Sequence, residues 1–279
     1  MVQRNTCLCG QPSALYMVMA LVGVCVVLVA WGTWSAVQHE GMEGVEKSVI
    51  PKRIFQTWKT HDLPPKMRAC VDALKRAHPD FEHQLMDDAE CLEFLRKHFD
   101  QEVVDAYRAL KPGAYKADLW RYCVLYIHGG IYLDIKYQCC DGFNLSAWVD
   151  APHLCKDVRY ERIVQGIYNA CLVCPAGDPL MQRCISQVVD NVQARYYGST
   201  QWDITGPTMM AQLLTDDDRK VCDLQHVFEA GGGGYIAYLG KRAIEMYPGY
   251  RDELVAIHDQ DGTPRYYELW ERREVYHKA

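Results

Sequence analysis

The sequence has little clustered positive charge. Its 279 residues carry 30 Lys and Arg against 36 Asp and Glu, which gives a formal net charge of −6, and the two signs are interspersed along the chain. Proteins that bind the phosphate backbone of a nucleic acid need clustered Lys and Arg. The composition therefore argues against nucleic acid as a partner.

Internal repeats and low-complexity tracts are also missing from the sequence, so a repeat architecture is not expected. Residues 49–279 are long enough to bury a substantial core as one domain, and no second domain is required. Strand patterns alternate with helix patterns along this part of the chain. Such alternation predicts an α/β sheet that is flanked by helices.

Charged residues are absent from one stretch near the N-terminus, between Ser13 and Trp34. About twenty apolar residues at helical rise match the core of a bilayer. We therefore predict a short tail at 1–13, a transmembrane signal anchor at 14–34 and a stem at 35–48. A cleaved signal peptide is the alternative, although this apolar run is longer than usual for one and no clear cleavage site follows it.

The most informative stretch, residues 114–141, reads AYKADLWRYCVLYIHGGIYLDIKYQCCD. Its apolar residues first recur at three- and four-residue steps, which predicts a largely buried helix. Asp118 and Arg121 lie three residues apart and so share one face of that helix. Gly129 and Gly130 supply a left-handed end, after which the chain turns into a strand.

A strand is predicted at 131–137, directly after the two glycines. Alternation places Tyr132, Asp134 and Lys136 on one face of this strand and the aliphatic residues on the other. Asp134 and Lys136 are therefore expected to point the same way. Tyr132 is interpreted as a packing residue and is left out of the candidate site.

Periodicity and helix breakers predict the remaining elements. Strands are expected at 53–58, 81–86 and 169–174, and helices at 65–77, 89–110 (two short ones), 178–196 and from Pro207 onward. Ligands in α/β folds bind beyond the carboxyl ends of the strands. Trp58, Asp87 and Asp134 each follow such an end.

The run from Ala117 to Asp134 resembles the core of glycosyltransferase family 32, which is known for a sugar-binding region containing a DXD motif. The resemblance covers roughly residues 49–215 and implies a GT-A-type nucleotide-sugar-binding (Rossmann-like) sheet, with residues 49–279 as the catalytic domain. Three further segments agree with the family in order, namely Ile50–Trp58, Asn169–Leu180 and Thr205–Pro207.

This resemblance implies a membrane-anchored glycosyltransferase. Such an enzyme moves a hexose from a nucleotide diphosphate sugar to a hydroxyl group of a glycan or glycolipid, with retention of configuration. In the family, positions matching Asp118 and Arg121 hydrogen-bond the donor sugar. Asp134 is expected to be the catalytic residue that holds ribose, sugar or metal, Trp58 to stack on the nucleobase and Asn169 to line the acceptor side.

Two of these assignments have plain structural alternatives. Without the surrounding motif, Asp118 and Arg121 would be interpreted as a salt bridge on a helix. Trp58 would be interpreted as a core residue.

One departure from the family pattern matters most: the chain reads Asp134-Ile135-Lys136 where Asp-x-Asp is usual. In the family the second Asp usually binds a divalent cation, Mn²⁺ or Mg²⁺, which neutralises the diphosphate leaving group. Two interpretations of Lys136 remain open. Either its ammonium binds the diphosphate itself, or it points away while another acid such as Asp141 completes a metal site with Asp134.

The lost carboxylate also allows a different function. A catalytically inactive pseudo-glycosyltransferase that only binds a sugar or nucleotide is the alternative to an enzyme, and Lys136 is its best support. Asp118, Arg121 and Asp134 remain in place, which favours the enzyme.

The cysteine content suits an oxidising lumen. Ten cysteines follow the predicted anchor, from Cys70 to Cys222, and Asn144-Leu145-Ser146 is an acceptor sequence for N-glycosylation. Free cysteines are also common buried hydrophobic residues, and ten thiols allow too many pairings for the connectivity to be deduced.

The orientation of the predicted anchor rests on the family resemblance. Only Arg4 precedes the span, whereas three Lys and Arg residues follow it by residue 53, so the positive-inside count does not favour a cytoplasmic N-terminus. Many members of the family are single-span Golgi or endoplasmic reticulum enzymes with a lumenal catalytic domain. The same arrangement is expected here.

The anchor and its orientation can be tested together. The full chain, expressed in a eukaryotic secretory system, should stay with membranes after alkaline carbonate extraction, because a span of this length is harder to strip than a peripheral contact. Protease added to sealed vesicles should spare the domain after residue 49. Digestion of that domain from the cytosolic side would contradict the lumenal assignment.

Overall fold

The structure is a computed structural model and describes residues 50–158, 165–230 and 232–278. All three ranges belong to the second of the two units into which the chain divides, Ser48–Ala279. The tail, anchor and stem predicted at 1–48 lie outside the described residues. Within the described ranges, no helix is both long and apolar enough to span a bilayer.

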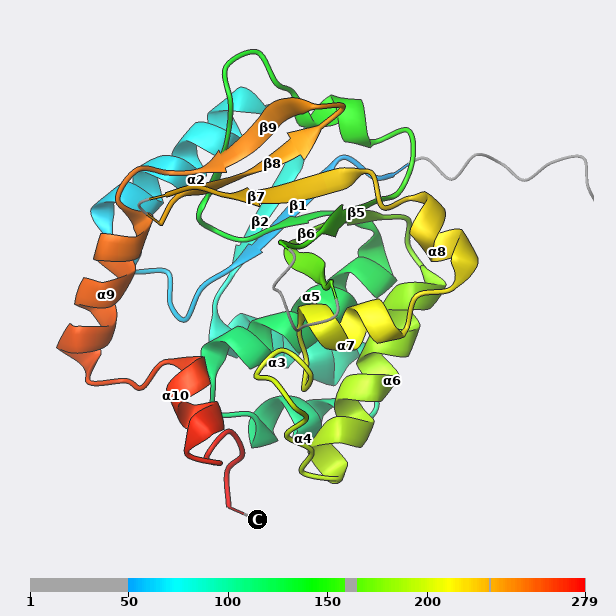
Figure 1. Cartoon of the computed structure of the whole chain (residues 1–279), viewed down its shortest axis with the longest axis vertical. Coiled ribbons are helices and arrows are strands. Elements are labelled where there is room, and N and C mark those ends of the chain that lie inside the picture. Colours follow the sequence, from blue (N-terminus) through cyan, green and yellow to red (C-terminus); the bar gives the residue numbers. More distant parts are fainter. Residues whose placement is uncertain (1–49, 159–164, 231, 279) are drawn as a thin grey trace, which may run out of the picture. The chain divides into compact units, whose positions relative to one another are not determined.

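The described part of the chain contains nine strands that form one sheet (Figure 1). The strands are β1 (Arg53–Thr57), β2 (Glu82–Met86), β3 (Gly130–Leu133), β4 (Tyr137–Cys139), β5 (His153–Lys156), β6 (Ile167–Cys174), β7 (Leu224–Phe228), β8 (Gly234–Tyr238) and β9 (Lys241–Met246). Their order in the sheet is β2-β1-β3-β6-β5-β7-β8-β9-β4. β1 is parallel to β2 and β3, and β5 is parallel to β7, whereas the other neighbours are antiparallel.

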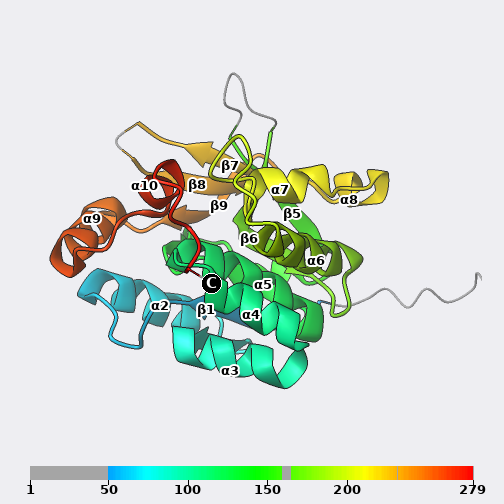
Figure 2. The same cartoon turned by 90° about the horizontal axis from the view of Figure 1, so that it is seen from below.

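Helices cover both faces of this sheet, as the alternating pattern predicts. They are α2 (Pro65–Ala77), α3 (Asp88–His98), α4 (Gln101–Ala109), α5 (Gly113–His128), the 3₁₀ helix η1 (Leu145–Trp148), α6 (Pro179–Gln193), α7 (Pro207–Gln212), α8 (Asp216–Lys220), α9 (Tyr250–Asp261) and α10 (Tyr266–Glu271). α3 to α7 pack on one face, where α4, α5 and α6 lie side by side (Figure 2). α2 and η1 pack on the other. The predicted α/β class is confirmed.

Side-chain alternation along the central strands divides the core into two clusters. Phe55 and Tyr132 face the cluster under α3 to α7. Ile54, Ile131 and Leu133 face the opposite cluster. The faces predicted for residues 131–133 are therefore correct.

The carboxyl ends of three parallel strands meet at one edge of the sheet. β1, β2 and β3 run in the same direction, so Trp58, Asp87 and Asp134, the residues that follow them, lie along that edge. β6 runs the opposite way and therefore begins there, and the N–H of Asp134 donates to the carbonyl oxygen of Ala170 at 2.9 Å. The predicted placement of the three residues at strand ends is confirmed.

The strand predicted at 131–137 is wrong in its second half. β3 ends at Leu133, and a turn follows in which the N–H of Tyr137 donates to the carbonyl oxygen of Asp134 at 3.1 Å. The chain leaves β3 because the next strand, β4, pairs with β9 instead of continuing along β6. The turn still directs Asp134 and Lys136 toward each other.

The predicted buried helix is α5, and its end depends on two glycines. Gly129 has φ +60°, and a Cβ there would lie 2.4 Å from the backbone nitrogen of Ala176. Gly130 has φ +116°, and its Cβ would lie 2.9 Å from the carbonyl oxygen of Arg53. Only glycine fits both conditions, so α5 can turn directly into β3.

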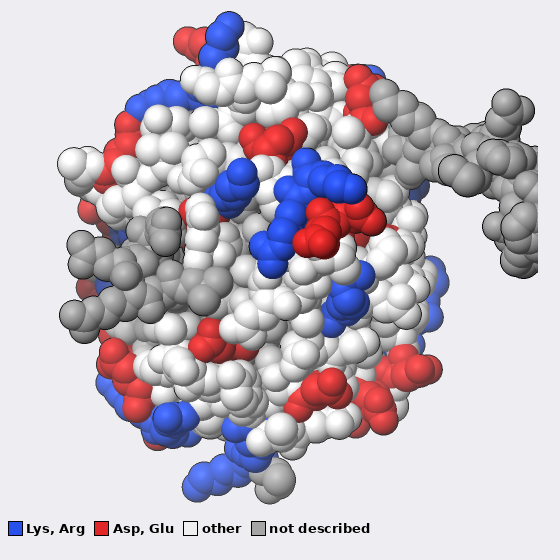
Figure 3. Space-filling view, turned by 45° about the vertical axis from the view of Figure 1, so that its right-hand side comes forward, with Lys and Arg blue, Asp and Glu red and all other residues white. Residues whose placement is uncertain are grey.

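Surface charge and cysteine placement agree with the sequence. Basic and acidic side chains are interspersed on the face shown in Figure 3. The acidic run Asp216–Asp218 opens the short helix α8, where Asp216 and Asp217 are exposed and Asp218 is partly buried. All ten described cysteines are free thiols, and eight of them are buried, as expected of small hydrophobic residues.

The two ends of α5 provide a matched test of this connection. Gly129→Ala should lower the free energy of unfolding by about 2–5 kcal/mol, because a left-handed conformation and a backbone clash both oppose a side chain there. Gly113→Ala, at the start of the same helix, meets open space and should change stability by less than about 1 kcal/mol. Urea unfolding of the two variants measures the difference, and equal stabilities would contradict the role given to Gly129.

Candidate functional site

The buried guanidinium group of Arg121 joins three elements at this edge of the sheet. From α5, its Nη2 lies 3.2 Å from Oδ1 of Asp118, and its Nη1 lies 3.4 Å from Oδ1 of Asp134 at the end of β3. Nη1 also donates to the carbonyl oxygen of Asn169 in β6 at 2.6 Å. The side chain is only 6% exposed, and the guanidinium lies 4.3 Å from the ring centroid of Tyr132.

Asp118 is held by side chains that arrive from distant parts of the chain. Its Oδ1 accepts a hydrogen bond from Nδ2 of Asn169 at 2.9 Å, and its Oδ2 accepts one from the hydroxyl of Thr205 at 2.7 Å. Asn169 also donates to the hydroxyl of Tyr122, which donates in turn to the carbonyl oxygen of Thr205. The carboxylate therefore has a fixed orientation.

Asp134 receives three partners. The hydroxyl of Tyr132 donates to Oδ1 of Asp134 at 3.0 Å, and the same oxygen faces Arg121. Nζ of Lys136 donates to Oδ2 of Asp134 at 2.5 Å. Its side chain is 23% exposed, more than that of Asp118 at 11%. The polar network is therefore most accessible from solvent at Asp134.

The ammonium of Lys136 lies among three tyrosine rings. Its Nζ is 5.3 Å from the ring centroid of Tyr137, 5.4 Å from that of Tyr168 and 5.9 Å from that of Tyr250. The backbone carbonyl of Lys136 accepts a hydrogen bond from the N–H of Tyr247 at 3.0 Å. The side chain is 12% exposed. Cation–π attraction and the ion pair with Asp134 together offset the cost of burying this charge.

The environment moves the ionisation of the two carboxylates in opposite directions. Burial raises the pKa of Asp118 from 3.8 to about 6, although Arg121 opposes this shift. Burial also acts to raise the pKa of Asp134, but Lys136 and Arg121 outweigh it and hold that pKa below its usual value. Burial likewise acts to lower the pKa of Lys136, yet Asp134 and the surrounding tyrosines keep it well above the ordinary value. Asp134 and Lys136 are therefore a charged pair at neutral pH.

This donor set does not fit a divalent cation at Asp134. Lys136 and Tyr132 each donate to one oxygen of the carboxylate, and Arg121 lies beside it. Two like unit charges ~4 Å apart repel by roughly 4 kcal/mol near a protein surface, and a divalent ion doubles that figure. Metal ligands must be free of protons and of competing cations.

The acids considered as additional metal ligands are placed differently. Asp141 is exposed and follows β4, which carries the chain roughly 10 Å from the turn at Asp134. Among the described residues, one cluster has three groups with the spacing of metal ligands, namely His61, Asp87 and Glu90. Asp87 and Glu90 cap α3 there, so this exposed cluster is explained by the helix end.

Trp58 lies near the network without joining it. The indole ring packs, partly buried, against the cluster that contains Ile135 and Tyr247. Its Nε1 is buried, with no hydrogen-bond partner among the described residues. Ile135 is the middle residue of the turn between Asp134 and Lys136, so the same cluster fixes both Trp58 and the turn.

The structure thus brings together five of the predicted site residues: Asp118, Arg121, Asp134, Lys136 and Asn169.

Sequence reasoning missed several members of the site. Tyr132 contacts both Asp134 and Arg121, so its interpretation as a packing residue was incomplete, and its place on the strand face of Asp134 was the signal. Thr205 lies in the Thr-Gly-Pro turn that the resemblance includes. Tyr168 and Tyr250 gave no signal, because only the fold brings them to Lys136.

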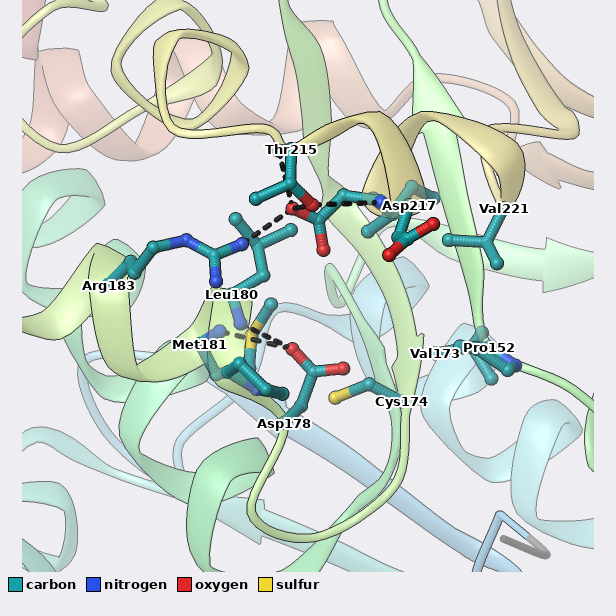
Figure 4. A pocket seen from close by; sticks show the side chains of 13 residues that line it. Pro152, Val173, Cys174, Asp178, Leu180, Met181, Arg183, Thr215, Asp217 and Val221 are labelled. Atoms are coloured by element: carbon teal, nitrogen blue, oxygen red, sulfur yellow. Dashed lines mark hydrogen bonds and ion pairs between the residues drawn. The ribbon is translucent and has the colours of Figure 1, made fainter. Parts of the chain in front are cut away.

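A separate cavity lies at the other end of β6. Its volume is about 380 Å³, and Cys174, Asp178 and Arg183 are among its lining residues (Figure 4). Asp178 accepts the N–H groups of the first turn of α6, and Arg183 forms an ion pair with Asp218 at 2.5 Å. Because these charged groups are paired within the wall, we do not assign this cavity a ligand.

Comparisons with known proteins extend the sequence resemblance. Residues 64–148 match the family model described as a glycosyltransferase sugar-binding region containing a DXD motif. Inositol phosphoceramide mannosyltransferase 3 of Schizosaccharomyces pombe is 36% identical over 98 residues, which are 34% of this chain and 26% of that protein. The initiation-specific alpha-1,6-mannosyltransferase of Candida albicans is 31% identical over 96 residues, which are 32% of this chain and 25% of that protein.

A solved structure titled PaToxG Glycosyltransferase aligns with a TM-score of 0.44 and 18% identity, over 62% of this chain and 72% of that one. The chain spans about a quarter of the length of the two mannosyltransferases. The predicted resemblance to family 32 is confirmed for the sugar-binding region.

The raised pKa of Asp118 predicts a specific pH dependence. Because the pKa is 3.8 in the unfolded chain and about 6 in the fold, this group favours folding below pH 4, and that contribution is lost as the pH rises to about 6. Relative to Asp118→Asn, the parent should therefore lose about 2–3 kcal/mol of unfolding free energy over this range. Urea unfolding of both proteins between pH 4 and pH 7 measures the difference, and parallel pH profiles would refute the shift.

Proposed function

We propose that this chain, which carries a family 32-like glycosyltransferase sugar-binding region, transfers a hexose from a nucleotide diphosphate sugar to a hydroxyl group of a glycan or glycolipid. The observation that carries the proposal is the buried network of Asp118, Arg121 and Asp134 at the carboxyl edge of β3. This edge is where α/β sheets bind ligands. We also propose that the sheet has the GT-A-type arrangement that binds a nucleotide sugar.

The reaction we propose is a front-face displacement with retention of configuration. The bond between the anomeric carbon and the diphosphate oxygen breaks, and a new bond forms on the same face to the oxygen of the acceptor hydroxyl. The hydroxyl proton passes to the leaving diphosphate. No protein nucleophile is required, so the site contributes by orienting the donor and stabilising the charge that develops on the leaving group.

Asp118 is suited to bind a hydroxyl of the donor sugar. Its Oδ2 accepts one hydrogen bond, from Thr205, and a carboxylate oxygen can accept more than one. Arg121 donates to the carbonyl oxygens of Ala117 and Asn169, and its guanidinium forms ion pairs with Asp118 and Asp134. We therefore propose that Arg121 mainly positions both carboxylates and offers the sugar what remains of its donor capacity.

Lys136 and Trp58 are proposed to bind the nucleotide part of the donor. Lys136 places a positive charge beside Asp134, where negative charge develops on the diphosphate. Trp58 follows β1 on the same edge and offers an aromatic face for the nucleobase. Asn169 is committed to Asp118 and Tyr122, which favours a positioning role, and its contact with an acceptor stays a prediction.

The relatives suggest where to begin with substrates and location. Both are named as mannosyltransferases, and the name of one gives inositol phosphoceramide as its acceptor. We propose an activated mannose as the first donor to test and a membrane lipid among the first acceptors. A catalytic domain at 49–279 in the Golgi or endoplasmic reticulum lumen, behind an anchor at 14–34, remains part of this proposal.

One observation favours a second candidate, the pseudo-glycosyltransferase. Lys136 fills the place of the second acid of the motif and is tightly paired with Asp134. A protein of this kind would bind a nucleotide sugar without turning it over. Turnover and binding must therefore be measured separately.

The proposal predicts turnover that depends on Asp134. The full-length protein should hydrolyse or transfer the sugar of at least one nucleotide hexose, and Asp134→Asn should slow that reaction roughly a hundredfold or more, as for other charge-stabilising groups. Melting temperatures are recorded alongside, because Asp134 pairs with two buried cations and its neutralisation is expected to cost stability.

Asp141→Asn is the matched control, since this exposed acid follows β4 away from the network. It should leave the rate unchanged. Binding without turnover across the panel of donors would favour the pseudo-glycosyltransferase, and normal turnover in a folded Asp134→Asn variant would refute the site.

A further inference from the structure

The pair formed by Asp134 and Lys136 has the charge of a complete metal site. Two aspartates with one divalent cation carry no net charge, and neither does one aspartate with one lysine. The second position of the motif here holds the lysine, whose Nζ lies 2.5 Å from Oδ2 of Asp134. The substitution therefore removes a carboxylate and supplies a cation in the same place.

The turn fixes this cation at the open end of the network. The N–H of Tyr137 closes the turn on the carbonyl oxygen of Asp134, and Ile135 anchors it in the hydrophobic cluster beneath. Asp134 has the most exposed side chain of the four charged residues in the network, Asp118, Arg121, Asp134 and Lys136. A diphosphate that reaches Asp134 therefore meets Lys136 directly.

The tyrosines around Lys136 hold its ammonium in place. Tyr137, Tyr168 and Tyr250 come from β4, β6 and the start of α9, so three separate elements surround one side chain. Tyr137 donates to the hydroxyl of Tyr168 at 2.8 Å, and the ring of Tyr168 stacks on His226 with centroids 3.7 Å apart. An ammonium restrained in this way costs little reorganisation when an anion binds.

We propose that Lys136 takes the place of the divalent cation, so that the donor diphosphate is bound and its departure stabilised without a metal ion. This inference rests on the proposed function, because it concerns the donor of that reaction. The inference goes beyond the proposed function by assigning the counter-charge of the diphosphate to one side chain, Lys136. In this arrangement, Lys136 replaces a divalent cation bound at Asp134.

The unmodified protein provides the first test. Full-length protein is titrated with GDP and with UDP by calorimetry, in excess EDTA and in MnCl₂. The affinity for the nucleotide that binds should be the same within about twofold in both conditions, because Lys136 already supplies the positive charge. Donor turnover, measured in parallel, should survive EDTA.

Substitutions at position 136 provide the second test. Lys136→Asp should weaken nucleotide binding in EDTA about tenfold to a hundredfold, the loss expected for one charge-assisted hydrogen bond, and Mn²⁺ should restore it. Electron paramagnetic resonance should show one more bound Mn²⁺ in Lys136→Asp than in the parent. Lys136→Gln should lose affinity without rescue by Mn²⁺, and Lys136→Arg should retain affinity in EDTA.

Lys220→Asp is the control for a change of charge alone, because Lys220 is exposed and pairs with Asp217 on α8. It should bind nucleotide as the parent does. Melting curves identify any variant that fails to fold. If a variant does not fold, the titrations of the parent in EDTA and in MnCl₂ still test whether nucleotide binding needs a metal ion.

The outcomes separate this inference from the proposed function. Nucleotide binding by the parent that requires Mn²⁺ would overturn the role of Lys136 and leave the glycosyltransferase standing. Failure of the parent to bind either nucleotide or any nucleotide hexose, in either condition, would overturn the proposed function and the inference together. Equal binding with and without metal, lost in Lys136→Gln, would establish the inference.

Discussion

The site depends on one buried positive charge, the guanidinium of Arg121. A charge with a 6% exposed side chain must be paired. Its partners are two carboxylates and two carbonyl oxygens, which come from α5, the end of β3 and β6. Those partners fix the distance between the helix and the two strands. Asp118 and Asp134 therefore face one another across Arg121, even though they lie on different elements.

The backbone connection between α5 and β3 places Arg121 beside Asp134. The helix ends at Gly129 and returns immediately as β3, so Arg121 and Asp134 are close in space although a helix end and a strand separate them in sequence. A longer connection would let the helix slide along the sheet. The close approach of Gly129 to Ala176 and of Gly130 to Arg53 leaves no room for such a slide. Packing at the C-terminal end of α5 thus fixes the position of Arg121 in the middle of the helix.

Local sequence patterns predicted the elements that depend on neighbouring residues. They did not predict contacts between residues that lie far apart in the sequence. The helix at 113–128, the glycine end and the strand faces of Ile131 and Tyr132 depend on neighbouring residues, so periodicity was sufficient. The end of β3 at Leu133 depends on the pairing of β4 with β9, more than a hundred residues later. Tyr250 reaches Lys136 only because that pairing brings α9 to the turn. No local spacing records such a contact.

Lys136 shows why the substitution in the motif is more than the loss of an acid. Burying an ammonium is costly unless its surroundings compensate, and here an aspartate and three aromatic faces from separate elements do so. A lysine that merely filled the position would extend its flexible chain into solvent instead. Residues from β4, β6 and α9 therefore pack around this charge. The site keeps Asp118 and Arg121 of the motif and surrounds one restrained cation with tyrosines, and this arrangement supports the proposed binding of a diphosphate.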